Sequence, residues 1–135
     1  MDWKIEVVVV PVSDLDRAKH FYAEQVGFNV DVDQHTGERT RVIQLTPSGS
    51  ACSIAFVAGM GDDDGAAPCP LKGLQLVVAD IAAARAHLVQ RGVEVSPIRH
   101  VDDGEWKDGH GGPWNSFVFF SDPDGNRWTV QEKPE

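Results

Sequence analysis

No apolar run in this sequence approaches the ~20 residues that a membrane-spanning helix needs. The first residues also lack a basic segment followed by an apolar stretch and a small-residue cleavage site, which a secretory signal would carry. These two absences predict a cytoplasmic protein that does not associate with membranes.

Positive charge is scarce as well. The 135 residues include 12 Lys and Arg against 21 Asp and Glu, which gives a formal net charge of −9 at pH 7. Such an excess of negative charge repels the phosphate backbone of nucleic acids and anionic lipid surfaces. Nucleic acid and membrane are therefore not expected as partners. With 41% hydrophobic residues, the chain has the composition and length of one globular domain.

Cysteines and familiar catalytic motifs are almost absent. Cys52 and Cys69 show no CxxC spacing and have no neighbouring His, so we expect two inert thiols rather than a disulfide. The sequence contains no GxSxG, P-loop or GxGxxG motif. Their absence argues against an α/β-hydrolase, a P-loop nucleotidase and a dinucleotide-binding dehydrogenase.

What the chain does contain is an internal repeat. The segment 12–22 (VSDLDRAKHFY) aligns with the segment 78–88 (VADIAAARAHL). A strand-like run precedes each copy, at 5–10 and at 74–78, and a Gly with a β-rich stretch follows each copy, at 27–30 and at 92–95. A repeat of this length indicates a supersecondary unit that pairs with its copy to bury its apolar face.

Each copy has the pattern of a strand, a helix and further strands. Residues 7–10 are apolar at both parities, so both faces of that strand should be covered. Ser13 or Asp14 is expected to cap the first helix, and Asp80 the second. The expected apolar stripes are Leu15, Ala18, Phe21 or Tyr22, and Val26 in the first helix, and Ile81, Ala84 and Leu88 in the second.

The remaining strands and loops complete a two-module organisation. Strands are expected at 39–46, 50–57, 117–120 and 127–131, the last two joined by a turn in which Gly125 takes a positive φ. The fold class is therefore α+β, with two tandem βαβββ modules at 1–58 and 71–135 and a linker at 59–70. A Gly- and Asp-rich insertion at 100–115 is expected to be a lid, a binding loop or a disordered segment.

The tandem βαβββ pattern, the segment beginning at Val12 and the Asp-Pro-Asp-Gly-Asn turn at 122–126 together resemble the vicinal-oxygen-chelate superfamily. This superfamily includes glyoxalases, bleomycin-resistance proteins and extradiol dioxygenases. The resemblance implies curled mixed sheets around a cup, the glyoxalase/bleomycin-resistance/dihydroxybiphenyl-dioxygenase-like fold. It also implies a homodimer, in some relatives with modules exchanged between the subunits.

In metal-dependent relatives, His and Glu side chains from four strands hold a divalent metal ion in the cup. The resemblance places Val7, Ala55, Gly73 and Thr129 at those positions of this chain. Three of these residues offer no side-chain donor, and a neutral hydroxyl is a weak ligand on its own. We therefore expect neither a metal nor another cofactor.

Residues in phase with those positions should face the same cup, because side chains alternate along a strand. They form an apolar set with a few hydrogen-bonding groups, which is typical of a small-molecule site. The set comprises Val7, Val9, Ser53, Ala55, Val57, Gln75, Val77, Arg127, Thr129 and Gln131.

The four tryptophans separate into two pairs. Trp106 and Trp114 lie in the insertion, where each has two open interpretations: it stacks on a flat ligand over the cup, or it anchors the insertion against the sheet edge. Trp3 and Trp128 fall in expected strands, and Trp128 is expected to pack under a helix because it is out of phase with Thr129.

Two function classes follow. The first is a metal-free binding protein that sequesters an aromatic or hydrophobic compound, as antibiotic-resistance relatives do. The second is a metal-independent lyase or isomerase, with His110, Arg127 and Gln131 as candidate catalytic groups. The missing metal ligands disfavour a metal-dependent glyoxalase or dioxygenase. The expected ligand contacts are Val7, Val9, Ala55, Gln75, Trp106, Trp114, Thr129 and Gln131, and the expected partners are that ligand and a second copy of the chain.

Overall fold

The computed structural model describes residues 1–59 and 69–134. The chain divides into two compact units, Met1–Pro70 and Leu71–Glu135. Each unit holds one mixed sheet with a helix on one face, which confirms the expected α+β class built from tandem βαβββ modules. Most of the expected linker at 59–70 lies outside the described residues. In the part of the chain that is described, no helix is long and apolar enough to cross a membrane.

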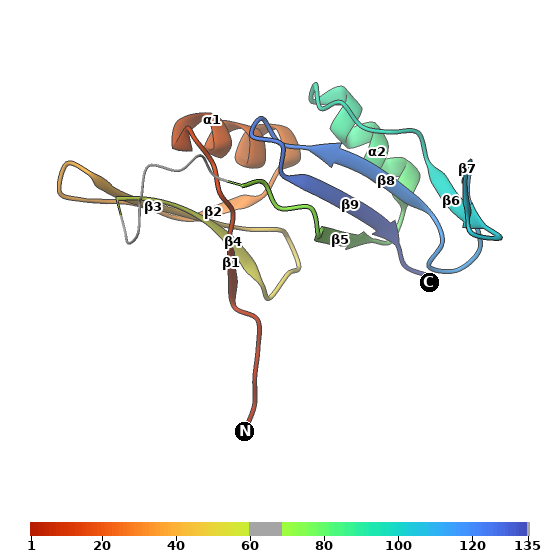
Figure 1. Cartoon of the computed structure of the whole chain (residues 1–135), viewed down its shortest axis with the longest axis horizontal. Coiled ribbons are helices and arrows are strands. Elements are labelled where there is room, and N and C mark those ends of the chain that lie inside the picture. Colours follow the sequence, from red (N-terminus) through yellow and green to blue (C-terminus); the bar gives the residue numbers. More distant parts are fainter. Residues whose placement is uncertain (60–68, 135) are drawn as a thin grey trace. The chain divides into compact units, whose positions relative to one another are not determined.

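The first unit begins with a short strand and a helix that changes character along its length. Its elements are β1 (Val7–Val9), α1 (Leu15–Lys19), the π-helical η1 (His20–Val26), β2 (Asn29–Thr36), β3 (Thr40–Thr46) and β4 (Ser53–Ala58). The strand order is β1-β4-β3-β2, with β1 parallel to β4 and the other pairs antiparallel (Figure 1).

The helix of the first unit is capped as expected and covers one face of its sheet. The Asp14 carboxylate accepts a hydrogen bond from the backbone N–H of Arg17, at 3.1 Å, which satisfies a donor that the first helical turn leaves unpaired. Ala18 and Tyr22 are fully buried, and the ring of Tyr22 lies 5.3 Å from that of Phe56 on β4. The core of this unit therefore lies between α1–η1 and the sheet.

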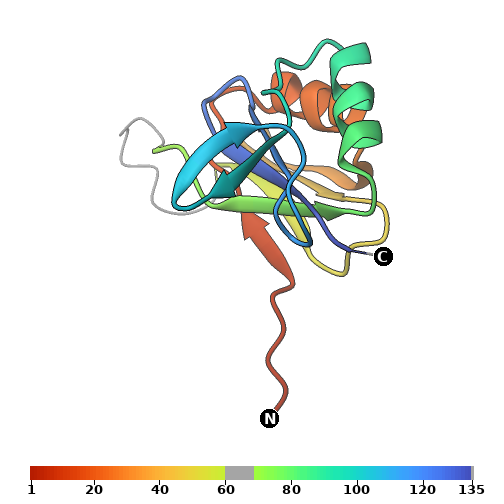
Figure 2. The ribbon, with the colours of Figure 1, turned by 90° about the vertical axis from the view of Figure 1, so that its right-hand side faces the viewer.

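The other face of β1 is not covered by the single chain. Val10 is 1% exposed on the helix side, but Val7 and Val9 are 41% and 52% exposed. The prediction that both faces of this strand are covered is therefore wrong for the single chain, because alternation directs Val7 and Val9 away from the helix. Trp3 was expected in a strand, but it precedes β1 and is 86% exposed in the N-terminal segment that extends away from the sheet (Figure 2).

The second unit repeats the scheme with one strand more. Its elements are β5 (Leu74–Val78), α2 (Ile81–Gln90), β6 (Arg99–Asp102), β7 (Glu105–Asp108), β8 (Phe117–Ser121) and β9 (Arg127–Glu132). The strand order is β5-β9-β8-β6-β7, with β5 parallel to β9. The expected β-rich stretch at 92–95 contributes only a bridge between Val95 and Phe120, and the strand that follows the helix forms later, at β6.

The core of the second unit lies between α2 and the central strands. Asp80 caps α2 by accepting a hydrogen bond from the N–H of Ala83, at 3.0 Å, as expected. Trp128 is 3% exposed and stacks on Phe120, with ring centroids 6.1 Å apart, on strands that α2 contacts. Trp128 is therefore buried, out of phase with Thr129 as expected, and its packing under a helix stays a prediction.

The insertion at 100–115 contains a β-hairpin, so the alternative of a disordered segment is wrong for its first half. β6 and β7 pair across a turn formed by Asp103, at φ 53°, and Gly104, at φ 77°. Asp-Gly is the preferred sequence for a two-residue turn with two positive φ angles. Both strands carry charged residues, which weaken the alternation of apolar and polar residues that would otherwise have predicted two strands.

A candidate small-molecule site on the second sheet

Strand register groups the predicted cup residues of the first unit on one face. Val7 lies opposite Ser53 and Val9 opposite Ala55, and alternation adds Val57. We call this the helix-free face of the first sheet. The face is largely aliphatic, and its most exposed side chains are those of Val7 and Val9.

Three polar groups of this face, those of Asp31, Thr46 and Ser53, are bonded to one another. The Thr46 hydroxyl donates to the carboxylate of Asp31, and the hydroxyl oxygens of Thr46 and Ser53 lie 2.6 Å apart. Ser53 is only 6% exposed. These groups are therefore already engaged within the protein, and the aliphatic side chains dominate what the face presents.

Register also places the predicted residues of the second unit on one face. Gln75 and Phe119 both lie opposite Thr129, and Val77 and Phe117 both lie opposite Gln131. Ser121 lies opposite Arg127 at the end of β8 and β9. The helix-free face of the second sheet thus comprises Gln75, Val77, Phe117, Phe119, Ser121, Arg127, Thr129 and Gln131.

Three aromatic rings cover the middle of that face. The ring of Trp106 meets Phe117 and Phe119 edge-on, at centroid distances of 5.4 and 5.3 Å, and remains 52% exposed. The sequence interpretation did not include Phe117 and Phe119, although their alternation with the buried Val118 and Phe120 marks them as facing away from the helix. We call Trp106, Phe117 and Phe119 the aromatic cluster.

Trp114 is held in an unfavourable backbone conformation at one end of the face. Its φ is 61°, a region that bulky side chains rarely adopt. Gln131 donates to its carbonyl oxygen at 2.8 Å, and Gln75 donates to Gln131 at 2.6 Å. The side chain of the next residue, Asn115, bonds both the N–H and the carbonyl of Val101. The side chain of Trp114 is therefore 51% exposed although hydrogen bonds hold the backbone around it in place.

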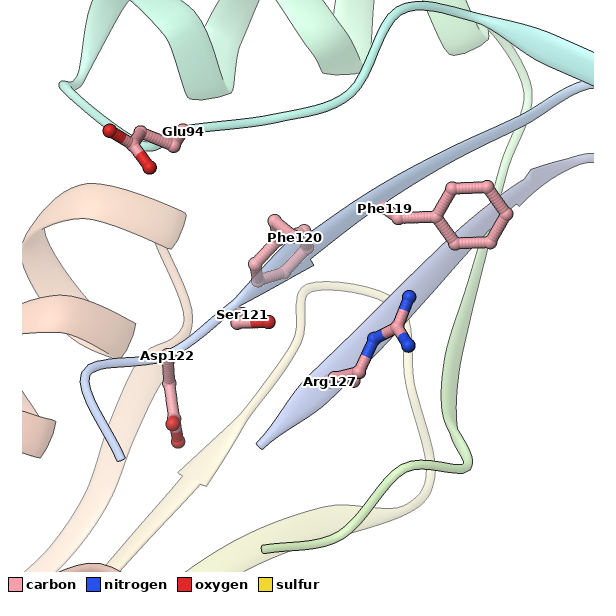
Figure 3. A pocket seen from close by; sticks show the side chains of 6 residues that line it. All are labelled: Glu94, Phe119, Phe120, Ser121, Asp122 and Arg127. Atoms are coloured by element: carbon pink, nitrogen blue, oxygen red, sulfur yellow. The ribbon is translucent and has the colours of Figure 1, made fainter. Parts of the chain in front are cut away.

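A pocket of about 370 Å³ opens at the other end of β8 and β9. It is lined by Glu94, Phe119, Phe120, Ser121, Asp122 and Arg127 (Figure 3). The carboxylate of Asp122 accepts hydrogen bonds from the backbone N–H groups of Asp124 and Asn126 and from the Asn126 side chain. Asp122 thus fixes the expected turn, in which Gly125 has a φ of 86°.

Two of the three candidate catalytic residues, Arg127 and Gln131, do not converge on one point. His110 is exposed in the segment after β7. Arg127 and Gln131 share β9 but stand four residues apart, or roughly 13 Å at the rise of a strand. Both ends of the Gln131 amide are engaged, by Gln75 and by Trp114. Arg127 and Gln131 therefore form no acid–base pair with each other.

The side chains at the four metal-ligand positions do not fit a divalent ion. Val7 and Ala55 lie on the helix-free face of the first sheet, Gly73 precedes β5, and Thr129 lies in β9. A single hydroxyl is the only donor among them. No group of three or more His, Cys, Asp or Glu in the described ranges is placed to hold a metal ion. Cys52 and Cys69 are free thiols.

Comparison with known proteins identifies the family of this chain. The model of the Glyoxalase/Bleomycin resistance protein/Dioxygenase superfamily matches residues 4–130. The structure of TnmS3, an antibiotic binding protein from Streptomyces sp. CB03234, is 32% identical, with a TM-score of 0.74 over 98% of this chain and 97% of that one. A glyoxalase/bleomycin resistance protein from the same organism is 34% identical, with a TM-score of 0.70 over 95% and 99%. The uncharacterized protein YetH of Bacillus subtilis (strain 168) is 25% identical, over 96% of this chain and 98% of its own. The chain described here belongs to the glyoxalase/bleomycin resistance protein/dioxygenase superfamily.

Proposed function

We propose that this chain is a metal-free binding protein that sequesters a flat aromatic or hydrophobic compound. The aromatic cluster is the observation that carries the proposal. Trp106 already packs edge-on against two Phe rings and still leaves half of its surface exposed. An aromatic ligand stacked there gains about 0.5–1.5 kcal/mol per ring pair in addition to the apolar area that it buries.

The strained Trp114 supports the same proposal. A non-glycine residue at positive φ costs roughly 1–2 kcal/mol, and such strain persists where function or surrounding contacts maintain it. The contacts of Gln131 and Asn115 maintain this conformation, and the result is an exposed indole rather than a buried one. We propose that this arrangement positions Trp114 as a second aromatic contact for the ligand.

The relatives favour binding over catalysis. TnmS3, at 32% identity, is an antibiotic binding protein. The separation of Arg127 from Gln131, whose amide is engaged at both ends, gives no support to the alternative of a metal-independent lyase or isomerase. The metal-free state is part of the proposal. It rests on the residues that stand at the four metal-ligand positions, which are Val7, Ala55, Gly73 and Thr129. A cytoplasmic location, expected from the sequence, is proposed with it.

We further propose that the protein is a homodimer. The helix-free face of the first sheet exposes Val7 and Val9 at 41% and 52%. Exposed apolar strand faces of this kind are commonly covered by a symmetry-related copy. That Val7, Val9 and Ala55 contact the ligand stays a prediction from the sequence, whereas the dimer proposal places Val7 and Val9 between the two copies.

Calorimetric titration in the presence of EDTA tests the proposed function. Bleomycin and a polycyclic aromatic enediyne serve as ligands, and mass spectrometry then identifies what is recovered. Saturable binding of at least one compound, recovered unchanged, supports sequestration. Conversion of the compound into a product would favour the lyase or isomerase alternative. Binding that disappears with EDTA and returns with a divalent ion would contradict the metal-free proposal.

A further inference from the structure

The helix-free face of the second sheet has two chemically different ends. Along β8 and β9 the opposed pairs run from Phe117 and Gln131, through Phe119 and Thr129, to Ser121 and Arg127. The Gln131 end is closed by hydrogen bonds within the protein. At the other end, opposed side chains on one face lie roughly 5 Å apart at Cβ, so Ser121 and Arg127 form a polar pair beside the aromatic cluster.

The guanidinium of Arg127 has no protein partner among the described residues, unlike those of several other arginines. Arg41 pairs with Asp33 and Asp16, and Arg99, which shares the face with Phe117, lies 3.5 Å from Asp108. Arg85 donates to a backbone carbonyl. A guanidinium presents five N–H donors in a planar fork, and in Arg127 the described part of the chain uses none of them.

Arg127 also lines the pocket at this end of the face. Figure 3 shows its guanidinium extending from β9 toward the ring of Phe119, while Glu94 lies at the opposite end of the labelled group. The Asp122 carboxylate is turned to the three N–H donors of its own turn. The pocket therefore offers a cation beside an aromatic ring on one side and an exposed carboxylate on the other.

We propose that Arg127 and Ser121 form a subsite for an anionic group, a carboxylate or phenolate, on an aromatic ligand whose ring lies against Phe119. This inference rests on the proposed function and specifies the class of ligand. The guanidinium fork matches a carboxylate in a bidentate pair, and the Ser121 hydroxyl adds a donor. Glu94 repels the anion from the far side and thereby orients the ligand. The protein carries a net charge of −9, but salt at physiological concentration screens charges that lie more than about 8 Å away. The charged groups beside the pocket therefore decide whether an anionic or a neutral ligand binds more tightly.

Calorimetry with two matched probes, 2-naphthoate and its neutral analogue 2-naphthamide, tests the subsite at pH 7. We expect the wild-type protein to bind the anion more tightly. Arg127→Gln should weaken 2-naphthoate binding about tenfold or more and change 2-naphthamide binding less than about twofold. Arg127→Lys keeps the charge but loses the planar fork, so its affinity for 2-naphthoate should lie between those of the wild-type protein and Arg127→Gln. Ser121→Ala should weaken the binding of 2-naphthoate alone, and by less than Arg127→Gln does.

Lys133→Gln is the control variant. It removes the same charge just beyond the opposite end of β9, roughly 20 Å away at the rise of a strand, and should leave both affinities unchanged. Equal wild-type affinities for the two probes, or an equal loss of both in Arg127→Gln, would overturn the anion subsite while leaving aromatic binding intact. Absence of binding by both probes would overturn the proposed function together with this inference.

Discussion

The two units arise from one repeat, yet their helix-free faces differ. The first presents aliphatic side chains such as Val7 and Val9, and three of its polar groups, Asp31, Thr46 and Ser53, are bonded to one another. The second presents the aromatic cluster with a polar group at each end. The helix-covered faces are alike, because both must bury a capped amphipathic helix. Folding places fewer demands on the free faces, so their differences indicate where function resides.

The largest effect should come from introducing a charge on the aliphatic face. If Val9 is covered in the dimer, Val9→Asp places an unpaired carboxylate in an apolar interface and should cost about 2 kcal/mol or more of association free energy. Val89→Asp is a matched control, since Val89 is 50% exposed on α2 and Val9 is 52% exposed on β1. Light scattering in the micromolar range should show dissociation of Val9→Asp alone. Identical behaviour of the two variants, or a monomeric wild-type protein, would contradict the dimer.

Removing the central ring of the aromatic cluster should affect both folding and binding. Trp106→Ala deletes the contacts that hold β7 against Phe117 and Phe119, as well as the exposed ring surface. We expect a loss of about 1–3 kcal/mol in ligand affinity and about 1 kcal/mol in unfolding free energy. Calorimetry and chemical denaturation measure the two quantities. An unchanged affinity would remove Trp106 from the site and leave it a purely structural anchor.

A substitution at Trp114 should lower ligand affinity without lowering stability. Trp114→Gly removes the indole and also relieves the positive φ of 61°, which glycine adopts without strain. Affinity for an aromatic ligand should fall by about 1–2 kcal/mol, whereas the unfolding free energy should stay the same or rise by up to about 1 kcal/mol. Loss of stability without loss of affinity would mean that Trp114 serves the fold alone.

The smallest effect concerns an ion-pair cluster between helix and sheet in the first unit. Arg41 binds both carboxylate oxygens of Asp33, at 2.9 and 3.0 Å, and Lys19 adds a contact at 2.7 Å. The hydrogen bonds from Arg41, and then those from Lys19, hold the pKa of Asp33 well below its usual value of 3.8. Because the pKa is lower in the folded state, this stabilisation is present above pH 3.8 and is lost as the pH falls below it.

Asp33→Asn tests this cluster. Because Asp33 is exposed and solvent screens its ion pairs, the substitution should lower the unfolding free energy at pH 7 by less than about 1 kcal/mol, and the difference from the wild-type protein should shrink as the pH falls below 3.8. Asp2→Asn in the exposed N-terminal segment is the control for the loss of one charge. Denaturant titrations at pH 7 and pH 3 provide the comparison, and a difference that persists unchanged at pH 3 would refute the assignment.

The sequence predicted the fold better than the site, for physical reasons. The cap at Asp80 and the burial of Trp128 follow from local spacing and were predicted correctly, and Asp14 was one of the two caps predicted for the first helix. The hairpin at β6 and β7 was missed because its strands carry mostly charged residues. Phe117 and Phe119 were missed because a strand of consecutive apolar residues hides which side chains face the helix. The conformation of Trp114 depends on Gln131, a contact between segments that no local pattern encodes.

The four indole N–H resonances in a nitrogen-15 NMR spectrum test the central claim most directly. In the presence of EDTA, titration with the polycyclic aromatic enediyne, which is larger than a naphthalene ring, should shift the indole signals of Trp106 and Trp114 saturably and with one affinity. Those of Trp3, in the exposed N-terminal segment, and Trp128, buried in the core, should stay in place. Shifts confined to Trp3 or Trp128, or shifts that require an added metal ion, would contradict a metal-free aromatic site on the second sheet.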